Sequence, residues 1–127
     1  MIKILVADDN PDILKTLEAR LRANQMDVVT APDCDQAIKK AYSENPDLII
    51  MDIRMPSVGG INAFESLKMF SRTSNIPVIF ITAYPGKEVE ERVFELGAAD
   101  FIAKPFATEE LLTKIQQALR RANNQTT

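Results

Sequence analysis

Short apolar runs alternate with amphipathic stretches along the whole chain. Five runs consist mainly of aliphatic and β-branched residues, and each ends at a polar or turn-forming residue. The clearest is Leu48–Met51, whose four apolar residues stop at Asp52. An unbroken run of this kind is typical of a strand covered on both faces, as in a parallel sheet. The predicted strands are Ile2–Ala7, Asp27–Ala31, Asp47–Asp52, Ile76–Thr82 and Ala99–Lys104.

Between these runs, apolar residues recur at the three- and four-residue spacing of an amphipathic helix. The first helix starts at Pro11, a residue that suits a first turn, and Asn10 or Asp9 can cap it. The last helix is predicted to be capped by Thr108. Three more helices are predicted over Asp33–Ser43, Ile61–Phe70 (with Met69 or Phe70 as a core contact) and Lys87–Leu96.

The strict alternation of five strands with five helices, joined by short loops, predicts one α/β fold. Strands in this order form a parallel sheet with helices on both faces and right-handed crossovers. We therefore expect a doubly wound (βα)5, flavodoxin-like domain with strand order 2-1-3-4-5. The domain is predicted to cover residues 1–122, followed by a polar, frayed tail over residues 123–127.

Composition removes several classes of function. The chain has 127 residues, a net charge of −3 and dispersed basic residues, which argues against a nucleic-acid surface. The absence of histidine excludes histidine-based catalysis and most zinc sites. One cysteine, Cys34, fits a reducing compartment, and no apolar segment reaches the ~18 residues of a membrane span. We expect a cytoplasmic protein that contacts neither nucleic acid nor membrane directly.

Polar residues gather at one predicted edge of the sheet. The ends of the first, third, fourth and fifth strands meet there, and these ends carry Asp8 with Asp9, Asp52, Thr82 and Lys104. Three carboxylates without histidine or cysteine form a hard-oxygen site that suits Mg²⁺, with Mn²⁺ as the alternative. Without a cation the three like charges would repel one another. The edge is therefore a candidate metal and phosphoryl site.

Each of these residues also has a plain structural interpretation. Asp8 and Asp9 can serve as helix caps, and Asp52 can be a turn residue after its strand. Thr82 suits a strand through its β propensity, and a lone Lys104 is more often a solvated charge. The coincidence of all of them at the expected strand ends favours the site.

The motifs at these strand ends resemble those of a known family. In order along essentially the whole chain, they are Val6–Asn10, Leu48–Pro56, Ile81–Ala83 and Gly97–Phe106. With these motifs the chain resembles a response-regulator receiver domain of two-component signalling, in its single-domain form. The loop departs from the family at Gly59, where an aspartate is common, which weakens the capping of the following helix.

The resemblance implies roles for the acidic residues. Asp52 resembles the phosphoacceptor, which takes a phosphoryl group from a phosphohistidine. Asp9 resembles the direct Mg²⁺ ligand, and Asp8 the acid that holds the metal through water. Asp52 and the backbone carbonyl of Arg54 complete the implied coordination.

The resemblance also implies a phosphate-binding and switching set. Lys104 matches the lysine that pairs with a phosphoryl oxygen, and the Lys104–Pro105 bond is expected to be cis. Thr82 matches the switch hydroxyl, Thr82 and Ala83 flank the phosphate, and Phe101 matches the switch aromatic, although a plain core role for Phe101 remains open. Arg54, Ala83 and Tyr84 occupy positions that modulate phosphoryl lifetime in the family.

The leading hypothesis is a phosphoacceptor signalling module. It takes phosphate from a histidine kinase or histidine phosphotransfer protein, for which Ile13 is a candidate contact. It then binds a downstream protein target through the face made by the fourth helix, fifth strand and fifth helix, or relays the phosphate. It is not a conventional enzyme but catalyses its own aspartyl phosphorylation and dephosphorylation. The alternatives are an aspartate-nucleophile phosphohydrolase, whose Asp-x-Asp motif Arg54 breaks, and a phosphorylation-independent interaction module.

Overall fold

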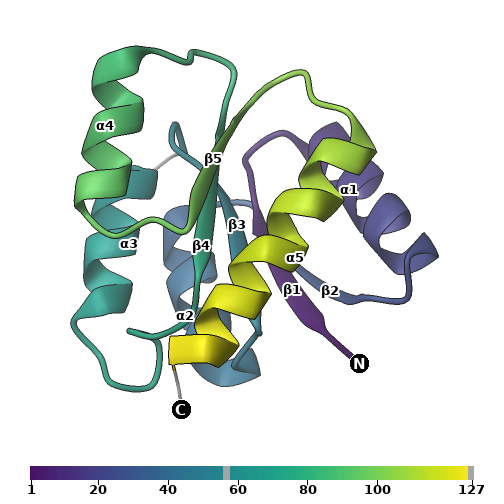
Figure 1. Cartoon of the computed structure of the whole chain (residues 1–127), viewed down its shortest axis with the longest axis horizontal. Coiled ribbons are helices and arrows are strands. Elements are labelled where there is room, and N and C mark those ends of the chain that lie inside the picture. Colours follow the sequence, from purple (N-terminus) through teal and green to yellow (C-terminus); the bar gives the residue numbers. More distant parts are fainter. Residues whose placement is uncertain (56–57, 126–127) are drawn as a thin grey trace.

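The computed structural model describes residues 1–55 and 58–125, and it places a central sheet between two layers of helices (Figure 1). The five strands are parallel and lie in the order β2-β1-β3-β4-β5, which confirms the predicted doubly wound fold. The strands are β1 Lys3–Ala7, β2 Asp27–Ala31, β3 Leu48–Asp52, β4 Val78–Thr82 and β5 Asp100–Ala103. The helices are α1 Pro11–Ala23, α2 Cys34–Glu44, α3 Gly60–Lys68, α4 Lys87–Glu95 and α5 Thr108–Gln125.

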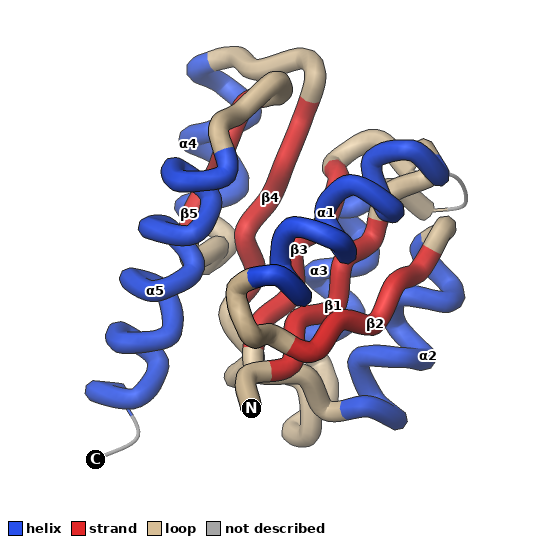
Figure 2. Tube along the Cα trace, turned by 90° about the vertical axis from the view of Figure 1, so that its right-hand side faces the viewer, coloured by secondary structure: helices blue, strands red, loops and turns tan. Residues whose placement is uncertain are grey.

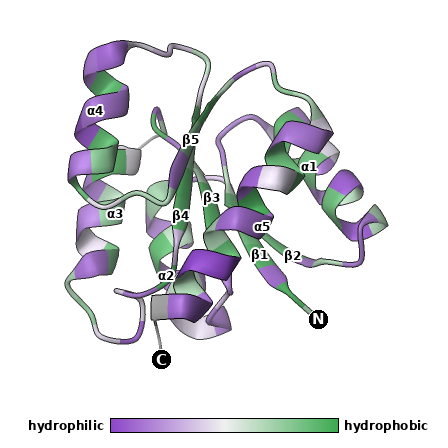
Figure 3. Cartoon of the chain, viewed as in Figure 1, coloured by the Kyte–Doolittle hydropathy of each residue, from purple (hydrophilic) through white to green (hydrophobic). Residues whose placement is uncertain are grey.

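Two apolar layers form the core, one on each face of the sheet. Every residue of β3 and β4 is buried, because helices cover both faces of these central strands. The layer on one side comes from α1 and α5, and the other from α2, α3 and α4. Figure 2 shows the strands lying between the helices. Figure 3 shows that the strands are mainly apolar and that the helices have hydrophilic outer faces. No helix of the described residues is long and apolar enough to cross a membrane.

The second layer is anchored by an aromatic pair. The rings of Phe64 on α3 and Phe80 on β4 are both fully buried and meet edge to face, with centroids 5.3 Å apart. Burial of one such side chain contributes about 1.5–3 kcal/mol to folding, and the edge-to-face geometry adds to this. The pair fixes α3 against the middle of the sheet.

Local side-chain bonds define several helix ends. Asn10 caps α1, because its Oδ1 accepts a hydrogen bond from the Asp12 N–H at 2.9 Å. No side chain caps α3 at Gly59, as the sequence predicts. The prediction that Thr108 caps α5 is wrong. Thr108 is the first helical residue, and the Leu111 N–H donates to the carbonyl oxygen of Ala107.

Two other predicted features change in the structure. Helix α3 ends at Lys68, and Met69 and Phe70 are 80% and 55% exposed, so the prediction of either as a core contact is wrong. Helix α5 continues to Gln125, so the predicted tail is helical over its first residues. Residues 126–127 of that tail, and Pro56 and Ser57 of the predicted loop, lie outside the described residues.

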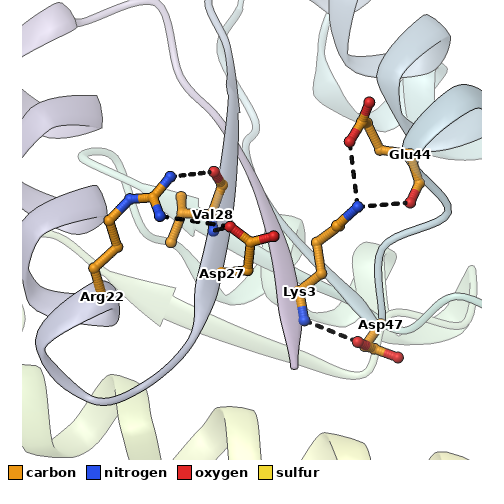
Figure 4. A network of polar contacts seen from close by, with 6 residues as sticks. All are labelled: Lys3, Arg22, Asp27, Val28, Glu44 and Asp47. Atoms are coloured by element: carbon orange, nitrogen blue, oxygen red, sulfur yellow. Dashed lines mark hydrogen bonds and ion pairs between the residues drawn. The ribbon is translucent and has the colours of Figure 1, made fainter. Parts of the chain in front are cut away.

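Polar contacts secure the amino ends of the strands, at the edge of the sheet away from the predicted site (Figure 4). The Lys3 N–H donates to Asp47 Oδ2 at 2.8 Å, and its Nζ lies 3.2 Å from Glu44 Oε1. Arg22 lies 3.5 Å from Asp27 Oδ1. Surface pairs such as these contribute at most about 1 kcal/mol each, so they define strand ends more than they stabilise the fold.

Candidate functional site

The parallel register brings the predicted site residues to one edge of the sheet. Ala7 in β1 pairs with Met51 in β3, so the residues that follow them, Asp8 and Asp52, are neighbours. Asp52 in turn pairs with Ile81 in β4, which places Thr82 next along that strand. The edge is the one toward which all five strands run, opposite the N-terminus in Figure 1.

Three carboxylates converge there. Carboxylate oxygens of Asp8, Asp9 and Asp52 all lie within 4.8 Å of one another. Asp8 is fully buried, Asp52 is 6% exposed and Asp9 is exposed. Such a set of hard oxygen donors, open to solvent on the side of Asp9, fits Mg²⁺, which keeps several waters. The Asn10 N–H donates to Asp8 Oδ1 at 2.9 Å and orients that buried carboxylate.

Lys104 supplies a counter-charge to two of these acids. Its Nζ donates to Asp8 Oδ2 at 2.8 Å and to Asp52 Oδ2 at 2.9 Å, and its side chain is only 15% exposed. Lys104 is therefore not a solvated strand-end charge. Its backbone N–H donates to the Thr82 carbonyl oxygen at 2.8 Å, which ties the chain after β5 to β4. The Lys104–Pro105 bond is cis, as predicted.

Burial and neighbouring charges shift the pKa values of Asp52 and Lys104. Burial raises the pKa of Asp52, and the nearby Asp8 charge adds to the rise, while hydrogen bonds from Lys104 and from the Arg54 N–H oppose it. Burial works to lower the pKa of Lys104, but the hydrogen bonds and charges of Asp8 and Asp52 outweigh it and raise that pKa overall. Lys104 is therefore held as an ammonium between the two carboxylates.

The hydroxyl and aromatic residues of the predicted switch are both buried. Thr82 is 2% exposed, and its Oγ1 accepts a hydrogen bond from the Tyr84 N–H at 3.0 Å. Phe101 in β5 pairs with Phe80 and packs in the layer of α2, α3 and α4, whereas Ala83 is exposed beside the site. The structure therefore brings Thr82 and Ala83 to the acidic edge and Phe101 into the adjoining core.

An arginine–tyrosine contact flanks the site and is absent from the sequence-based predictions. The Arg54 N–H donates to Asp52 Oδ1 at 3.0 Å, and the Arg54 guanidinium carbon lies 4.2 Å from the centre of the Tyr84 ring. This distance is that of a cation–π contact. Both residues are predicted to lie beside the phosphoryl site, two positions after Asp52 and Thr82, but nothing in the sequence indicates that their side chains meet.

Gly60 is a supporting residue that the sequence analysis does not identify. Its N–H donates to the Ile53 carbonyl oxygen at 2.8 Å, so the start of α3 lies directly against the chain after Asp52. A Cβ atom at Gly60 would lie 2.3 Å from the Asp52 carbonyl oxygen and 2.9 Å from Ile53 Cα. Because both are backbone atoms, they can move only by displacing Asp52. The Gly59–Gly60 pair after the strand is the signal that could have found it.

Gly60→Ser is expected to lower the free energy of unfolding by about 2 kcal/mol, the usual cost of overpacking. Urea denaturation monitored by circular dichroism measures the change. Gly86→Ser is the matched control, because a Cβ there meets nothing within 4 Å and serine is a good cap for α4. A Gly60→Ser variant as stable as the control would show that the start of α3 can move away from the backbone of Asp52 and Ile53 at little cost.

Comparison with known proteins agrees with this geometry. Residues 4–116 match the family model of the response regulator receiver domain. The probable transcriptional regulator ycf27 of Cyanophora paradoxa is 39% identical over 126 residues, which cover 98% of this chain and 51% of the relative. The alkaline phosphatase synthesis transcriptional regulatory protein PhoP of Bacillus subtilis is 36% identical over 120 residues, or 94% and 49% of the two chains. The chain spans about half the length of the curated relatives it matches.

Solved structures match over almost their full length. The chemotaxis protein CheY4 of Vibrio cholerae is 30% identical with a TM-score of 0.88, and the match covers 93% of this chain and 98% of that one. The BeF3-activated N-terminal receiver domain of RstA from Klebsiella pneumoniae is 29% identical with a TM-score of 0.85, again over 93% and 98%. Since the family model spans most of the sequence and the fold agrees, the chain belongs to the response regulator receiver domain family.

Proposed function

We propose that this chain is a phosphoacceptor that takes a phosphoryl group onto Asp52 from a phosphohistidine. The observation that carries the proposal is a buried Asp52 carboxylate bonded to the Lys104 ammonium, beside the carboxylates of Asp8 and Asp9. Membership of the receiver family supports a histidine kinase or histidine phosphotransfer protein as the donor.

The transfer is an in-line displacement. An Asp52 carboxylate oxygen attacks phosphorus while the phosphorus–nitrogen bond of the donor breaks, and the bonding electrons stay on the imidazole nitrogen. Such a reaction depends on positioning and on charge neutralisation more than on acid–base chemistry. The Arg54 N–H holds the Asp52 carboxylate in place, and the Lys104 ammonium, which bonds to Asp52 Oδ2, would exchange this bond for one to a phosphoryl oxygen. Thr82 and Ala83 flank the same oxygens.

The acidic cluster is the metal site in this proposal. Asp8, Asp9 and Asp52 would hold Mg²⁺ or Mn²⁺, together with the backbone carbonyl of Arg54. The cation supplies positive charge against the phosphoryl oxygens. Oxygen-only donors without histidine or cysteine support this choice over zinc or copper.

Phosphorylation would change the charge and the hydrogen bonds of the site. An acyl phosphate brings a charge of about −1.5 to −2 where the carboxylate had one. The Thr82 hydroxyl, which accepts a bond from the Tyr84 N–H in this structure, can turn to donate to a phosphoryl oxygen. That movement would alter the packing next to Phe101. The face formed by α4, β5 and α5, to which a downstream protein target would bind, would change with it. Phosphotransfer onward and slow self-catalysed hydrolysis are the two routes by which the phosphate leaves.

Intact-mass spectrometry after incubation with acetyl phosphate tests the proposal. We expect a single, transient phosphoryl adduct in the presence of Mg²⁺ and none in the presence of EDTA. Without the cation, the three carboxylates would repel the negatively charged phosphoryl group. The absence of an adduct at any time or metal concentration would overturn the proposal. Rapid turnover of an unrelated ester such as p-nitrophenyl phosphate would favour a phosphohydrolase instead.

A further inference from the structure

An exposed aromatic groove lies between the last turns of α2 and α3. We name it the α2–α3 groove. Tyr42 on α2 is 56% exposed, and Phe70, just after α3, is 55% exposed. Monomeric proteins seldom gather large apolar side chains on one surface unless the surface binds something. The groove has a volume of about 480 Å³ and is lined by Ile38, Lys39, Tyr42, Leu67, Phe70 and Thr73.

The groove is held in shape by its own hydrogen bonds. Arg72 Nε donates to the Tyr42 carbonyl oxygen at 2.6 Å, and its guanidinium carbon lies 5.0 Å from the centre of the Tyr42 ring. The buried Thr73 hydroxyl donates to the Leu67 carbonyl oxygen at 2.6 Å and fixes the turn that carries Phe70. A surface that is ordered before binding loses little conformational entropy when a partner docks.

Two cations at the groove have no carboxylate partner in the part of the chain that the structure describes. Lys39 lines the groove, and Arg72 contacts both the ring and the carbonyl oxygen of Tyr42. None of the ion pairs within residues 1–55 and 58–125 includes Lys39 or Arg72. Lys39 and Arg72 therefore give this apolar groove a cationic border.

We propose that the α2–α3 groove docks an acidic amphipathic helix of a partner protein. Its apolar stripe would lie on Tyr42 and Phe70, and its carboxylates would meet Lys39 and Arg72. Grooves between helices bind amphipathic helices through residues at i, i+3, i+4 and i+7. Tyrosine and arginine are also the residue types that contribute most binding energy at interfaces.

A partner is favoured over a second copy of this chain. The chain does carry an acidic surface with an exposed apolar residue, since Phe94 on α4 is 43% exposed among Glu90, Glu91 and Glu95. The α4 surface also includes Lys87, however, and Lys87 Nζ lies 4.0 Å from Glu91 Oε1, so part of its negative charge is already balanced within the chain. A more strongly acidic helix from another protein therefore complements Lys39 and Arg72 better than α4 does.

The groove is remote from the phosphoacceptor edge. Arg72, which contacts Tyr42, also lines the surface formed by Pro46, Asp47 and Pro77, which precede β3 and β4, whereas Asp52 is the last residue of β3 at its other end. Figure 1 shows the turn after α3 at the lower left of the molecule, and the N-terminus also lies in the lower part of the view. Docking therefore leaves the acidic site open, and the groove is independent of the proposed function.

The test uses a synthetic peptide of about 18 residues with leucine and phenylalanine at i, i+3, i+4 and i+7 and glutamate elsewhere. ¹H–¹⁵N spectra of the full chain, titrated with this peptide, are expected to shift at Tyr42, Phe70 and their neighbours. Arg72→Glu is expected to weaken binding at least about fivefold, which is a modest loss for an interface arginine. Lys15→Glu, the same charge reversal at an exposed position of α1, is expected to leave the affinity unchanged.

Lys39→Glu is the second variant, because it changes the border of the groove without touching the Arg72–Tyr42 contact, and thermal melting confirms that each variant is folded. Equal binding to the Arg72→Glu, Lys39→Glu and Lys15→Glu variants, shifts that map elsewhere, or equal binding of a scrambled peptide would overturn the proposal. Concentration-dependent association of the unmodified chain in sedimentation, abolished by Phe94→Ala and by Arg72→Glu, would also overturn it by assigning the groove to a second copy.

Discussion

Asp52→Asn is expected to abolish the phosphoryl adduct formed with acetyl phosphate and Mg²⁺. An amide oxygen is a poor nucleophile and cannot form a stable acyl phosphate, whereas Asn occupies the same volume and can keep the hydrogen bond from the Arg54 N–H. The fold should persist, because the substitution removes one of three crowded negative charges. Intact-mass spectrometry of the variant beside the unmodified chain, over the same times, measures the result.

Asp47→Asn is the matched control for this experiment. Asp47 immediately precedes β3 at the opposite edge of the sheet, where it accepts a hydrogen bond from the Lys3 N–H. The adduct should form in this variant at the unmodified rate. An undiminished adduct in Asp52→Asn would instead identify another acceptor, such as Asp8 or Asp9, and peptide mapping after borohydride trapping would locate it.

Lys104→Met is expected to lower the free energy of unfolding by about 3 kcal/mol in EDTA at pH 7. The substitution keeps the aliphatic stem but removes the ammonium that bonds to Asp8 and Asp52, and it leaves two buried carboxylates without a counter-charge. Breaking a buried ion pair from one side commonly costs about 3–5 kcal/mol. Urea denaturation with and without Mg²⁺ measures the loss, and we expect the cation to restore part of it.

The loss of unfolding free energy in Lys104→Met should also become smaller as the pH falls. Burial already raises the pKa of Asp52, and without the ammonium the pKa rises further. A carboxyl whose pKa is higher in the folded than in the unfolded state contributes stability at low pH and loses it as the pH rises through the folded pKa. The destabilisation is therefore largest near neutral pH and smallest below the ordinary carboxyl range. A loss that does not vary with pH would contradict this explanation.

Lys114→Met is the control for Lys104→Met. Lys114 Nζ lies 3.1 Å from Asp100 Oδ1, and the two side chains are 25% and 16% exposed. It pairs with a single, better-solvated carboxylate, so its loss should cost about 1 kcal/mol and show no response to Mg²⁺. Equal losses of unfolding free energy in the two variants would contradict the explanation that Lys104 stabilises the fold by neutralising two buried carboxylates.

The order of elements and the identity of the site residues could be predicted from the sequence, because both depend on local patterns. Residues of β3 and β4 are buried on both faces, so their apolar runs are unbroken and mark the strands directly. Parallel alternation then limits the topology to few choices, and the carboxyl ends of strands in such a sheet meet at one edge. Asp8, Asp52, Thr82 and Lys104 are therefore brought together by rules that act on the sequence alone.

Only the tertiary structure decided how these side chains are paired and which apolar residues remain outside. The position of the Lys104 ammonium between two carboxylates and the contact of Arg54 with Tyr84 depend on side-chain directions, which sequence spacing does not specify. Helical spacing favoured Met69 or Phe70 as a core residue, but α3 stops at Lys68, and both side chains are exposed to solvent. Periodicity describes a helix while it lasts, whereas the packing of the surrounding chain decides where it ends.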